Sequence, residues 1–335
     1  MMRQRNQITE SFYRLTPAAI LVMLVACSQE SVPGMEQAAT PPAPPAEPRP
    51  TGLIAADAEW EQVSQGYVYT DSPVAGEGAE VFFAAPIRSM LYRVDAAGEL
   101  HVFDKATAMT MGLTRGADGR MYGCRNQGAQ IVVYDADGSY QSLYQGVITP
   151  LPNNPAAPGE FCNDIAVSKN GNLWFTDRVN RKVMLLDTQG EVSVVADGFR
   201  GNGIGLSLDE QTIVVTDSIE PRLWAFAVAA DGSLTERVGF FGPLHTVRQL
   251  ANKEIVAEGR PGTNGVTVDA EGRFYVASFY GIQVYEPEGN YIGVIDGPQG
   301  FVSNLVFAGI NRDVLYTSGT TGLWRIPMLV RGVER

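Results

Sequence analysis

Short runs of alternating hydrophobic and polar residues fill the chain from about residue 60 to residue 328. Such runs are typical of β-strands, and no long amphipathic helical pattern interrupts them. Turns that contain Gly separate the runs, and Gly supplies the positive φ that hairpins require. The turns are Asp95-Ala-Ala-Gly98, Ala117-Asp-Gly119, Asp135-Ala-Asp-Gly138, Lys169-Asn-Gly171, Asp187-Thr-Gln-Gly190, Ala230-Asp-Gly232, Asp269-Ala-Glu-Gly272 and Glu286-Pro-Glu-Gly289. This pattern predicts an all-β chain of antiparallel strands.

One of these stretches recurs. The segment FCNDIAVSKNGNLWFTD (161–177) is echoed at 200–217, 262–278, 109–124 and 302–318, with a degenerate first copy at 70–85. The copies are roughly 40 to 60 residues apart, which is the period of four-stranded propeller blades. The sequence therefore predicts a six-bladed β-propeller of four-stranded antiparallel blades around a central channel. One residue anchors each copy: Asp71, Met111, Asn163, Asn202, Asn264 and Asn304.

The segment EWEQVSQGYVY (59–69) precedes the first anchor. We predict that it forms the outer strand of the last blade, whose inner strands come from residues 303–326. Such an arrangement ties the two ends of the ring together and removes an exposed strand edge.

The N-terminus carries a targeting signal. Arg3, Arg5 and Arg14 precede an apolar run at 17–26 that is short for a membrane span, and Cys27 follows it. The sequence Leu-Val-Ala-Cys at 24–27 resembles the lipobox of bacterial lipoproteins, in which the Cys is lipidated. Cleavage by signal peptidase without a lipid is the alternative. We expect a signal peptide at 1–26, a Pro-rich tether at 27–55 and the propeller at 56–330.

The residue after Cys27 is Ser28, which by the lipoprotein sorting rule indicates the outer membrane of a Gram-negative bacterium. The protein would face the periplasm as a monomer and contact the membrane only through its lipid anchor. With 25 Lys and Arg against 37 Asp and Glu, the net charge is −12. This charge argues against nucleic acid as a partner.

The usual catalytic signatures are absent from the sequence. It contains no HExxH, no GxSxG and no P-loop, which argues against metalloprotease, α/β-hydrolase and NTPase chemistry. The chain has 2 His and 3 Cys, without a CxxC or a Cys/His cluster, so a zinc site of the usual kind is not expected. Cys124 and Cys162 would form a disulfide in an oxidising compartment or remain buried as free thiols.

The anchors predict a ring of polar groups. In a propeller the first strand of each blade lines the channel, so residues that recur at its start converge on one axis. Carboxylate and amide oxygens arranged in this way suit a hard cation such as Ca²⁺. The alternative for Asn163 and for its neighbour Asp164 is a local role, in which their side chains terminate the preceding loop through hydrogen bonds to the backbone.

The order of these motifs resembles the regucalcin/gluconolactonase (SMP-30/gluconolactonase-like) family of six-bladed propellers, over nearly all of residues 60–328. The resemblance implies a divalent-metal site, with Ca²⁺ preferred over Mg²⁺, Mn²⁺ or Zn²⁺. Asp71 in TDSPV stands where the family has the Glu of its E-(G/S)-P-V motif. Asn163 stands at the Asn of PND, Asn202 at the Asn of PNG, and Asn264 at the Asp of PDG.

Two of these positions depart from the family pattern. Asp71 is one methylene shorter than Glu, so a cation would lie closer to the first blade or be reached through water. Asn264 replaces a carboxylate, which should weaken cation binding because affinity follows the charge of the ligands. The change also removes a group that the family favours as general base or nucleophile, since an Asn accepts no proton at neutral pH.

The resemblance implies a metal-dependent hydrolase that acts on a lactone or ester in the periplasm, with a small-molecule substrate. The carboxylates considered as catalytic residues are Asp71, Glu160, Asp164 and Glu258. The residues considered for substrate binding are Thr110, Arg125, Asn126 and Asn304. Two alternatives stay open: a propeller that binds a ligand or protein without turnover, and a lyase or phosphotriesterase-like activity that uses the same metal ring.

Overall fold

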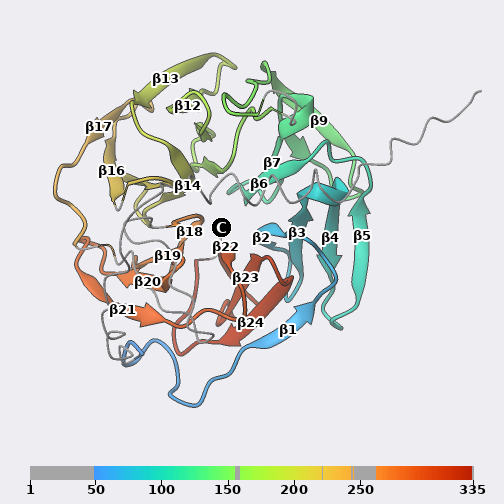
Figure 1. Cartoon of the computed structure of the whole chain (residues 1–335), viewed down its shortest axis with the longest axis vertical. Helices are drawn as coiled ribbons and strands as arrows, with labels where there is room; N and C mark the ends of the chain where they lie inside the picture. Colours follow the sequence, from blue (N-terminus) through green and yellow to red (C-terminus); the bar gives the residue numbers. More distant parts are fainter. Residues whose placement is uncertain (1–48, 155–158, 221, 243, 245–261, 334–335) are drawn as a thin grey trace, which may run out of the picture.

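The computed structural model describes residues 49–154, 159–220, 222–242, 244 and 262–333. The described residues form six four-stranded antiparallel sheets arranged around a central axis (Figure 1). The predicted six-bladed β-propeller is therefore confirmed. Cys27, the signal peptide at 1–26 and Glu258 lie outside the described residues. Within them, no helix has the length and hydropathy of a membrane span.

Each of the first three blades takes its four strands from one continuous stretch of chain, innermost strand first. Blade one contains β2 (Asp71–Ala75), β3 (Val81–Ala85), β4 (Met90–Val94) and β5 (Leu100–Asp104). Blade two contains β6 (Thr110–Arg115), β7 (Met121–Arg125), β8 (Gln130–Tyr134) and β9 (Tyr140–Gln145). Blade three contains β10 (Ile165–Val167), β11 (Leu173–Asp177), β12 (Lys182–Leu186) and β13 (Val192–Asp197). The short 3₁₀ turns η1 (Pro86–Arg88) and η2 (Asn126–Gly128) follow β3 and β7.

The remaining blades continue around the ring. Blade four contains β14 (Gly201–Leu206), β15 (Thr212–Asp217), β16 (Leu223–Val228) and β17 (Leu234–Glu236). Blade five contains β18 (Val266–Val268), β19 (Phe274–Ser278), β20 (Gly281–Tyr285) and β21 (Tyr291–Ile295). Blade six contains β22 (Val302–Ala308), β23 (Val314–Gly319) and β24 (Leu323–Pro327), and it is completed by β1 (Glu61–Ser64) from the start of the domain.

The ring is closed by β1, which pairs antiparallel with β24. This confirms the predicted closure by the segment 59–69. Upstream of β1, Leu53 and Ile54 are buried in the same hydrophobic cluster as residues of blades five and six. The packed domain thus begins before residue 56, because two residues assigned to the tether contribute to its core.

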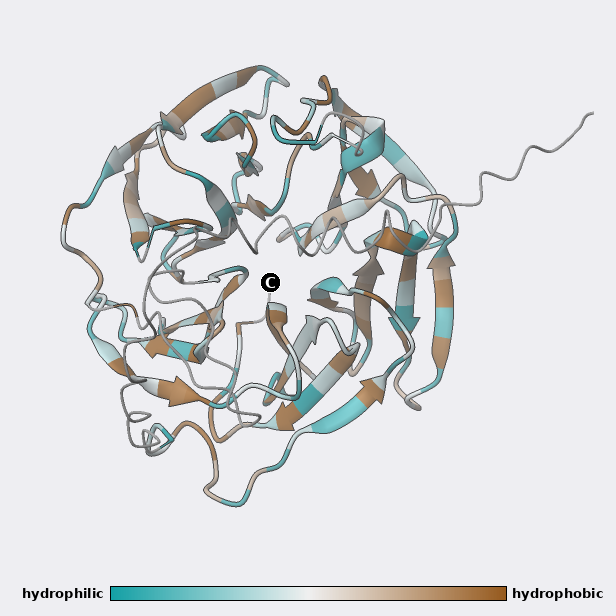
Figure 2. Cartoon of the chain, in the orientation of Figure 1, coloured by the Kyte–Doolittle hydropathy of each residue, from teal (hydrophilic) through white to brown (hydrophobic). Residues whose placement is uncertain are grey.

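The hydrophobic core lies between the blades. Inner strands such as β3 and β19 are buried along their whole length, whereas the outer strand β5 has three exposed residues out of five. Figure 2 shows that β5 carries both hydrophobic and hydrophilic residues, as expected of a strand at the outer edge of a blade. Burial of the inner strands fixes the six first strands around the axis, and those strands position the candidate site.

Candidate active site

A one-residue bulge marks the start of the first strand in four blades. In blade four, Gly201 pairs with Asp217 and Ile204 pairs with Val215, so two residues lie between pairs that a regular ladder would separate by one. The same register shift occurs in blades one, two and six. A bulge leaves residues unpaired and redirects their side chains. The bulge leaves two residues between successive pairs in blades one, two and four, and Ser303 alone in blade six, just ahead of the regular part of the strand.

The register brings the three predicted Asn ligands to equivalent positions. Asn163, Asn202 and Asn264 each lie two residues before the first regular core residue of blades three, four and five. Asp71 lies three residues before the core residue of blade one, so it is one position earlier than the Asn residues. Asn304 lies one position later than they do, and Ser303 is the true blade-six equivalent. The repeat alignment was therefore wrong by one residue at both positions.

Threonine hydroxyls of neighbouring blades hold this arrangement. Thr176 Oγ1 donates to the backbone carbonyl of Asn202 at 2.6 Å, and Thr216 Oγ1 donates to that of Asn264 at 2.9 Å. All four residues are buried. The sequence analysis gave these threonines no role, although each precedes an Asp at the end of a second strand and the repeated Thr-Asp was visible.

The amide of Asn202 is incompletely bonded. Its Nδ2 donates to the carbonyl of Thr263 at 3.4 Å, but its buried Oδ1 has no hydrogen-bond partner among the described residues. Asn163 Nδ2 donates to Glu160 Oε1 at 3.4 Å, which turns Oδ1 of Asn163 away from Glu160. A buried acceptor without a donor is costly unless something else satisfies it. A cation at the axis would do so.

Asp71 supplies the carboxylate of the ring. Its Oδ2 accepts a hydrogen bond from the Tyr69 hydroxyl at 2.8 Å, and its Oδ1 accepts one from the backbone N–H of Ser72 at 2.8 Å. Burial raises the pKa of Asp71 from 3.8 to about 6, although these hydrogen bonds and the charge of Arg178 oppose the rise. Tyr69 was not singled out from the sequence, because it lies outside the repeated stretch.

Asp164 and Asn304 form a polar bridge across the channel. They occupy the same strand position in blades three and six, which face each other in a ring of six. Asn304 Nδ2 donates to Asp164 Oδ2 at 3.5 Å and to Ser72 Oγ at 3.3 Å. Asp164 also accepts from the backbone N–H groups of Ile165 and Ile204. Burial first, and then the charge of Asp71, raise the pKa of Asp164 to about 7.

Small residues make room for this bridge. The equivalent position is Gly or Pro in the other four blades: Pro73, Gly112, Gly203 and Gly265. A Cβ on Gly265 would lie 1.9 Å from Asn304 Oδ1, and a Cβ on Gly112 would lie 2.7 Å from the Cα of Asp164. The channel therefore admits one bridging pair. That pair separates the end of the channel that holds Asp71 and the three Asn ligands, which we call the ring end, from the space beneath it.

Glu160 and Arg178 form an ion pair near the ring. Arg178 Nη2 lies 2.6 Å from Glu160 Oε2, and its Nε lies 3.1 Å from Oε1. Glu160 is buried, whereas Arg178 keeps 25% of its side-chain surface exposed. The charge of Arg178 also acts on Asp71 and on Tyr69. Arg178 was missed from the sequence because it follows the strand as a single charged residue without a motif.

The polar residues proposed for substrate binding in blade two have contacts within the protein. Thr110 is fully buried and donates to the carbonyl of Thr107. Arg125 donates to the carbonyl of Ala106, and its guanidinium lies 4.0 Å from the ring centroid of Tyr140. Arg125 also forms an ion pair with Asp104 of blade one at 3.4 Å, so these contacts tie both side chains to the junction of blades one and two. Their assignment to substrate binding stays a prediction.

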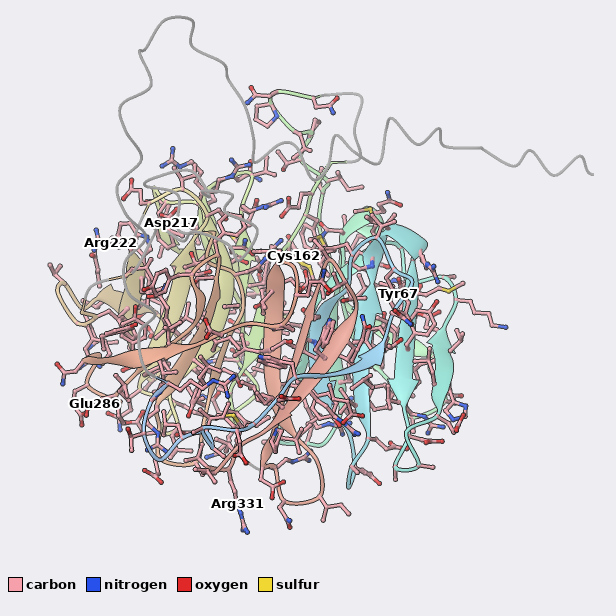
Figure 3. All side chains as sticks on the ribbon, turned by 60° about the horizontal axis from the view of Figure 1, so that its bottom comes forward. Tyr67, Cys162, Asp217, Arg222, Glu286 and Arg331 are labelled. Atoms are coloured by element: carbon pink, nitrogen blue, oxygen red, sulfur yellow. A yellow bond between two sulfur atoms is a disulfide. The ribbon has the colours of Figure 1, made fainter. Side chains whose placement is uncertain are left out.

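The loop ahead of Asn163 is fixed at two points. Asn126 Oδ1 accepts the backbone N–H groups of Phe161 at 2.6 Å and Cys162 at 3.3 Å. Cys124 and Cys162 form a disulfide with their Cα atoms 6.0 Å apart, which decides between the two alternatives left open by the sequence. In Figure 3, Cys162 lies toward the same face of the propeller as Asp217. The disulfide links blade two to the residue directly before Asn163.

The donors at the ring fit a hard cation. Asp71 contributes a carboxylate, and Asn163, Asn202 and Asn264 contribute neutral amides, all of them buried. In the described part of the chain, no three His, Cys, Asp or Glu side chains are grouped to hold a metal. A site here would depend on amide oxygens, which Ca²⁺ accepts and which softer metals use less. The partnerless Oδ1 of Asn202 is the observation that favours such a ligand.

The chain belongs to the SMP-30/Gluconolactonase/LRE-like family, because the sequence model of that family matches residues 70–321. A gluconolactonase of Zymomonas mobilis is 27% identical over 49% of this chain and 49% of its own length. The chain thus spans about half the length of the curated relatives it matches.

Solved structures show the same fold. A gluconolactonase from Xanthomonas campestris is 26% identical, with a TM-score of 0.67 over 86% of this chain and 98% of its own. A calcium-binding regucalcin from Agrobacterium tumefaciens is 17% identical, with a TM-score of 0.64 over 82% of this chain and 96% of its own.

Proposed function

We propose that the protein is a divalent-cation-dependent hydrolase that opens a lactone or cleaves an ester, with Ca²⁺ as the cation. The partnerless Oδ1 of Asn202, in a ring that also contains Asp71, carries this proposal. Family membership supports the reaction class, because relatives in the family are gluconolactonases. The calcium-binding regucalcin supports the choice of ion.

When bound, the cation would polarise the substrate carbonyl. Asp71, Asn163, Asn202 and Asn264 would hold it. Tyr69 keeps its proton, since burial and the charge of Asp71 raise its pKa well above the usual value, and it donates to the Asp71 carboxylate. That hydrogen bond fixes the orientation of the one ring carboxylate.

Asp164 is our candidate for the group that takes a proton from water. Its pKa of about 7 lies in the range that suits a general base near neutral pH. Glu160 has a different role, because two hydrogen bonds from Arg178 hold its carboxylate and its Oε1 also accepts Asn163 Nδ2. We assign Glu160 to positioning Asn163 and Arg178.

The test combines metal analysis with an assay. The purified protein should contain close to one equivalent of Ca²⁺ by elemental analysis, and it should open glucono-δ-lactone faster than buffer alone. Metal removal should abolish the rate, and Ca²⁺ should restore it. Asp164→Asn should lower kcat by about 100-fold or more, in line with the loss of a general base, and retain the metal. A protein that neither binds a divalent cation nor opens any lactone would overturn the proposal.

A second function has one observation in its favour. Asn264 stands where the family resemblance implies Asp, so the ring has a single carboxylate. A cation-binding propeller without turnover would show stoichiometric Ca²⁺ and no hydrolysis in the same experiment. Asn264→Asp would then tighten Ca²⁺ binding without creating activity.

We also propose that the protein is a periplasm-facing outer-membrane lipoprotein. The Cys124–Cys162 disulfide supports an oxidising compartment. Cys27→Ala should shift the protein from the detergent phase to the aqueous phase in detergent partitioning, because the lipid attaches at that residue. If the protein that keeps Cys27 also partitions into the aqueous phase, the lipid anchor is disproved.

A further inference from the structure

The end of the channel opposite the ring has a different character. Beneath the Asp164–Asn304 bridge, the first strands enclose a cavity of about 130 Å³ that we call the floor cavity. Its walls come from the first strands of all six blades and are mostly apolar. Asp164 and Asn304 of the bridge line one end of it, and Val333 also lines it. In Figure 3, Glu286 and Arg331 lie on the face away from Cys162, and Arg331 is two residues before Val333 in the chain.

Two arginines line the floor cavity. Arg115 ends the first strand of blade two, and Arg312 lies in the first hairpin turn of blade six. Arg115 Nε donates to the carbonyl of Ala75 at 2.8 Å, and Arg312 Nη2 donates to the carbonyl of Gly76 at 3.0 Å. The two guanidinium groups thus approach the end of β2 from the blades on either side of blade one.

The positive charges of this pair are not neutralised by ion pairs. Among the described residues, no carboxylate forms an ion pair with Arg115 or Arg312. The charges of Glu77, Glu80 and Asp118 reach Arg115, but Glu80 pairs with Arg93 and Asp118 pairs with Arg120. Burial and the charge of Arg312 both lower the pKa of Arg115. In a chain of net charge −12, two converging cations without a directly bonded carboxylate among the described residues are unexpected.

Arg312 has a donor that nothing satisfies. Its Nη1 is buried and has no hydrogen-bond partner in the described structure. A guanidinium presents five N–H donors, and leaving buried ones unpaired carries a desolvation cost. An oxyanion in the floor cavity would accept from this group and neutralise part of the local charge.

The backbone of Arg312 points to a role beyond packing. All six blades have a turn between their first and second strands in which one N–H bonds to the carbonyl three residues earlier. In five of them the donor residue has positive φ: it is Gly119, Gly171 and Gly272 in blades two, three and five, but Glu210 in blade four and Arg312 in blade six. Positive φ is unfavourable for a residue with a Cβ, and such conformations concentrate at functional sites. The Glu210 carboxylate accepts the N–H of Lys169.

From this geometry we infer a binding site for a small oxyanion, phosphate or carboxylate, in the floor cavity, held by Arg312 and Arg115. The site is separate from the proposed cation ring, because the Asp164–Asn304 bridge lies between them. It goes beyond the hydrolase function and does not depend on it.

Titration of metal-free, chelator-free protein at constant ionic strength tests the inference, with inorganic phosphate in one arm and acetate in the other. We expect saturable one-to-one binding of at least one of them. Arg312→Gly should weaken it by about tenfold or more, since hydrogen bonds from a charged donor are lost. Arg115→Gln should weaken it as well. Binding of acetate alone would identify carboxylates as the ligand, and binding of phosphate alone would identify phosphates.

Matched variants keep the test falsifiable. Arg312→Gly introduces the residue that three other blades carry at this position, so it should fold with a melting temperature within about 4 °C of the parent. Glu210→Gly makes the same backbone change in blade four and should leave anion binding intact. The inference fails if neither anion binds, or if Arg312→Gly binds as well as Glu210→Gly.

Discussion

The two ends of the channel are built from the same six first strands, yet they carry opposite charge. At the ring end, Asp71 and three Asn amides contribute buried carboxylate and amide groups, and the buried Asp164 carboxylate belongs to the bridge beneath them. At the floor end, Arg115 and Arg312 expose N–H donors. The repeat unit sets where side chains reach the axis, while individual blades decide which chemistry they bring. If both proposals hold, this propeller would bind a cation and an anion on one axis, with a polar bridge between them.

The disulfide should support ligand binding at the ring end but not at the floor end, and its removal is the largest loss of stability that we predict for any variant. Cys124 and Cys162 are 38 residues apart, so the double variant Cys124→Ser/Cys162→Ser should lose about 3 to 4 kcal/mol of unfolding free energy. Because Cys162 directly precedes Asn163, Ca²⁺ affinity should also fall by about tenfold.

Denaturant titrations and calorimetry, with phosphate binding as the control, measure these effects. Equal losses of Ca²⁺ and phosphate binding would mean that the disulfide acts on the whole fold and not on one end.

The charge of Asp71 should dominate cation binding. Asp71→Asn leaves the ring without a carboxylate, so Ca²⁺ affinity should fall on the order of 100-fold. Asp231 lies in an exposed turn, and Asp231→Asn removes the same charge from the surface as a control. Calorimetric titration of both variants would contradict the ring if they bound Ca²⁺ equally well.

The ring end should also make stability depend on pH. Burial raises the pKa of Asp71 to about 6 and that of Asp164 to about 7, so the folded state favours their neutral forms. Their contribution to stability is fully present below about pH 4 and is lost as pH rises toward 7. Without metal, the unfolding free energy should fall by about 4 kcal/mol between pH 5 and pH 7.5.

Exposed carboxylates do not obscure this trend. Hydrogen bonds lower the pKa of exposed carboxyl groups such as Asp95 and Asp137. The stability that these groups contribute is therefore lost only at a pH below the range from 5 to 7.5. Asp164→Asn should flatten the profile measured by urea unfolding. A profile that rises from pH 5 to 7.5 in both proteins would show that the buried pair is not its source.

Restoring the family carboxylate should have the smallest effect. Asn264→Asp adds a second negative charge to the ring and should tighten Ca²⁺ binding by about tenfold. Asn163→Ala removes one neutral oxygen and should weaken it by less than Asp71→Asn does. If Asn163 serves only its loop, Asn163→Ala would cost about 1 kcal/mol of stability and leave the affinity unchanged.

Much of the fold followed from the sequence because its signals are local. Alternating runs, Gly turns and a recurring Asn at strand starts predicted six blades, and the segment 59–69 was placed correctly as the closing strand. The same repeat predicted that Asn163, Asn202 and Asn264 are equivalent. Periodicity and turn chemistry reside in a few neighbouring residues, so a single sequence reveals them.

What the sequence alone determined is thus the repeat and its polar anchors, because both are patterns of neighbouring residues. The tertiary structure decided the rest. The strand register placed Asp71 and Asn304 one position away from the equivalent Asn residues, and a one-residue difference changes which groups face the axis. The bridge from Asp164 to Asn304 spans 140 positions of the chain, and the approach of Arg312 to Gly76 spans 236. Contacts of that range arise only when the ring of blades closes, since closure brings blade six beside blade one and opposite blade three.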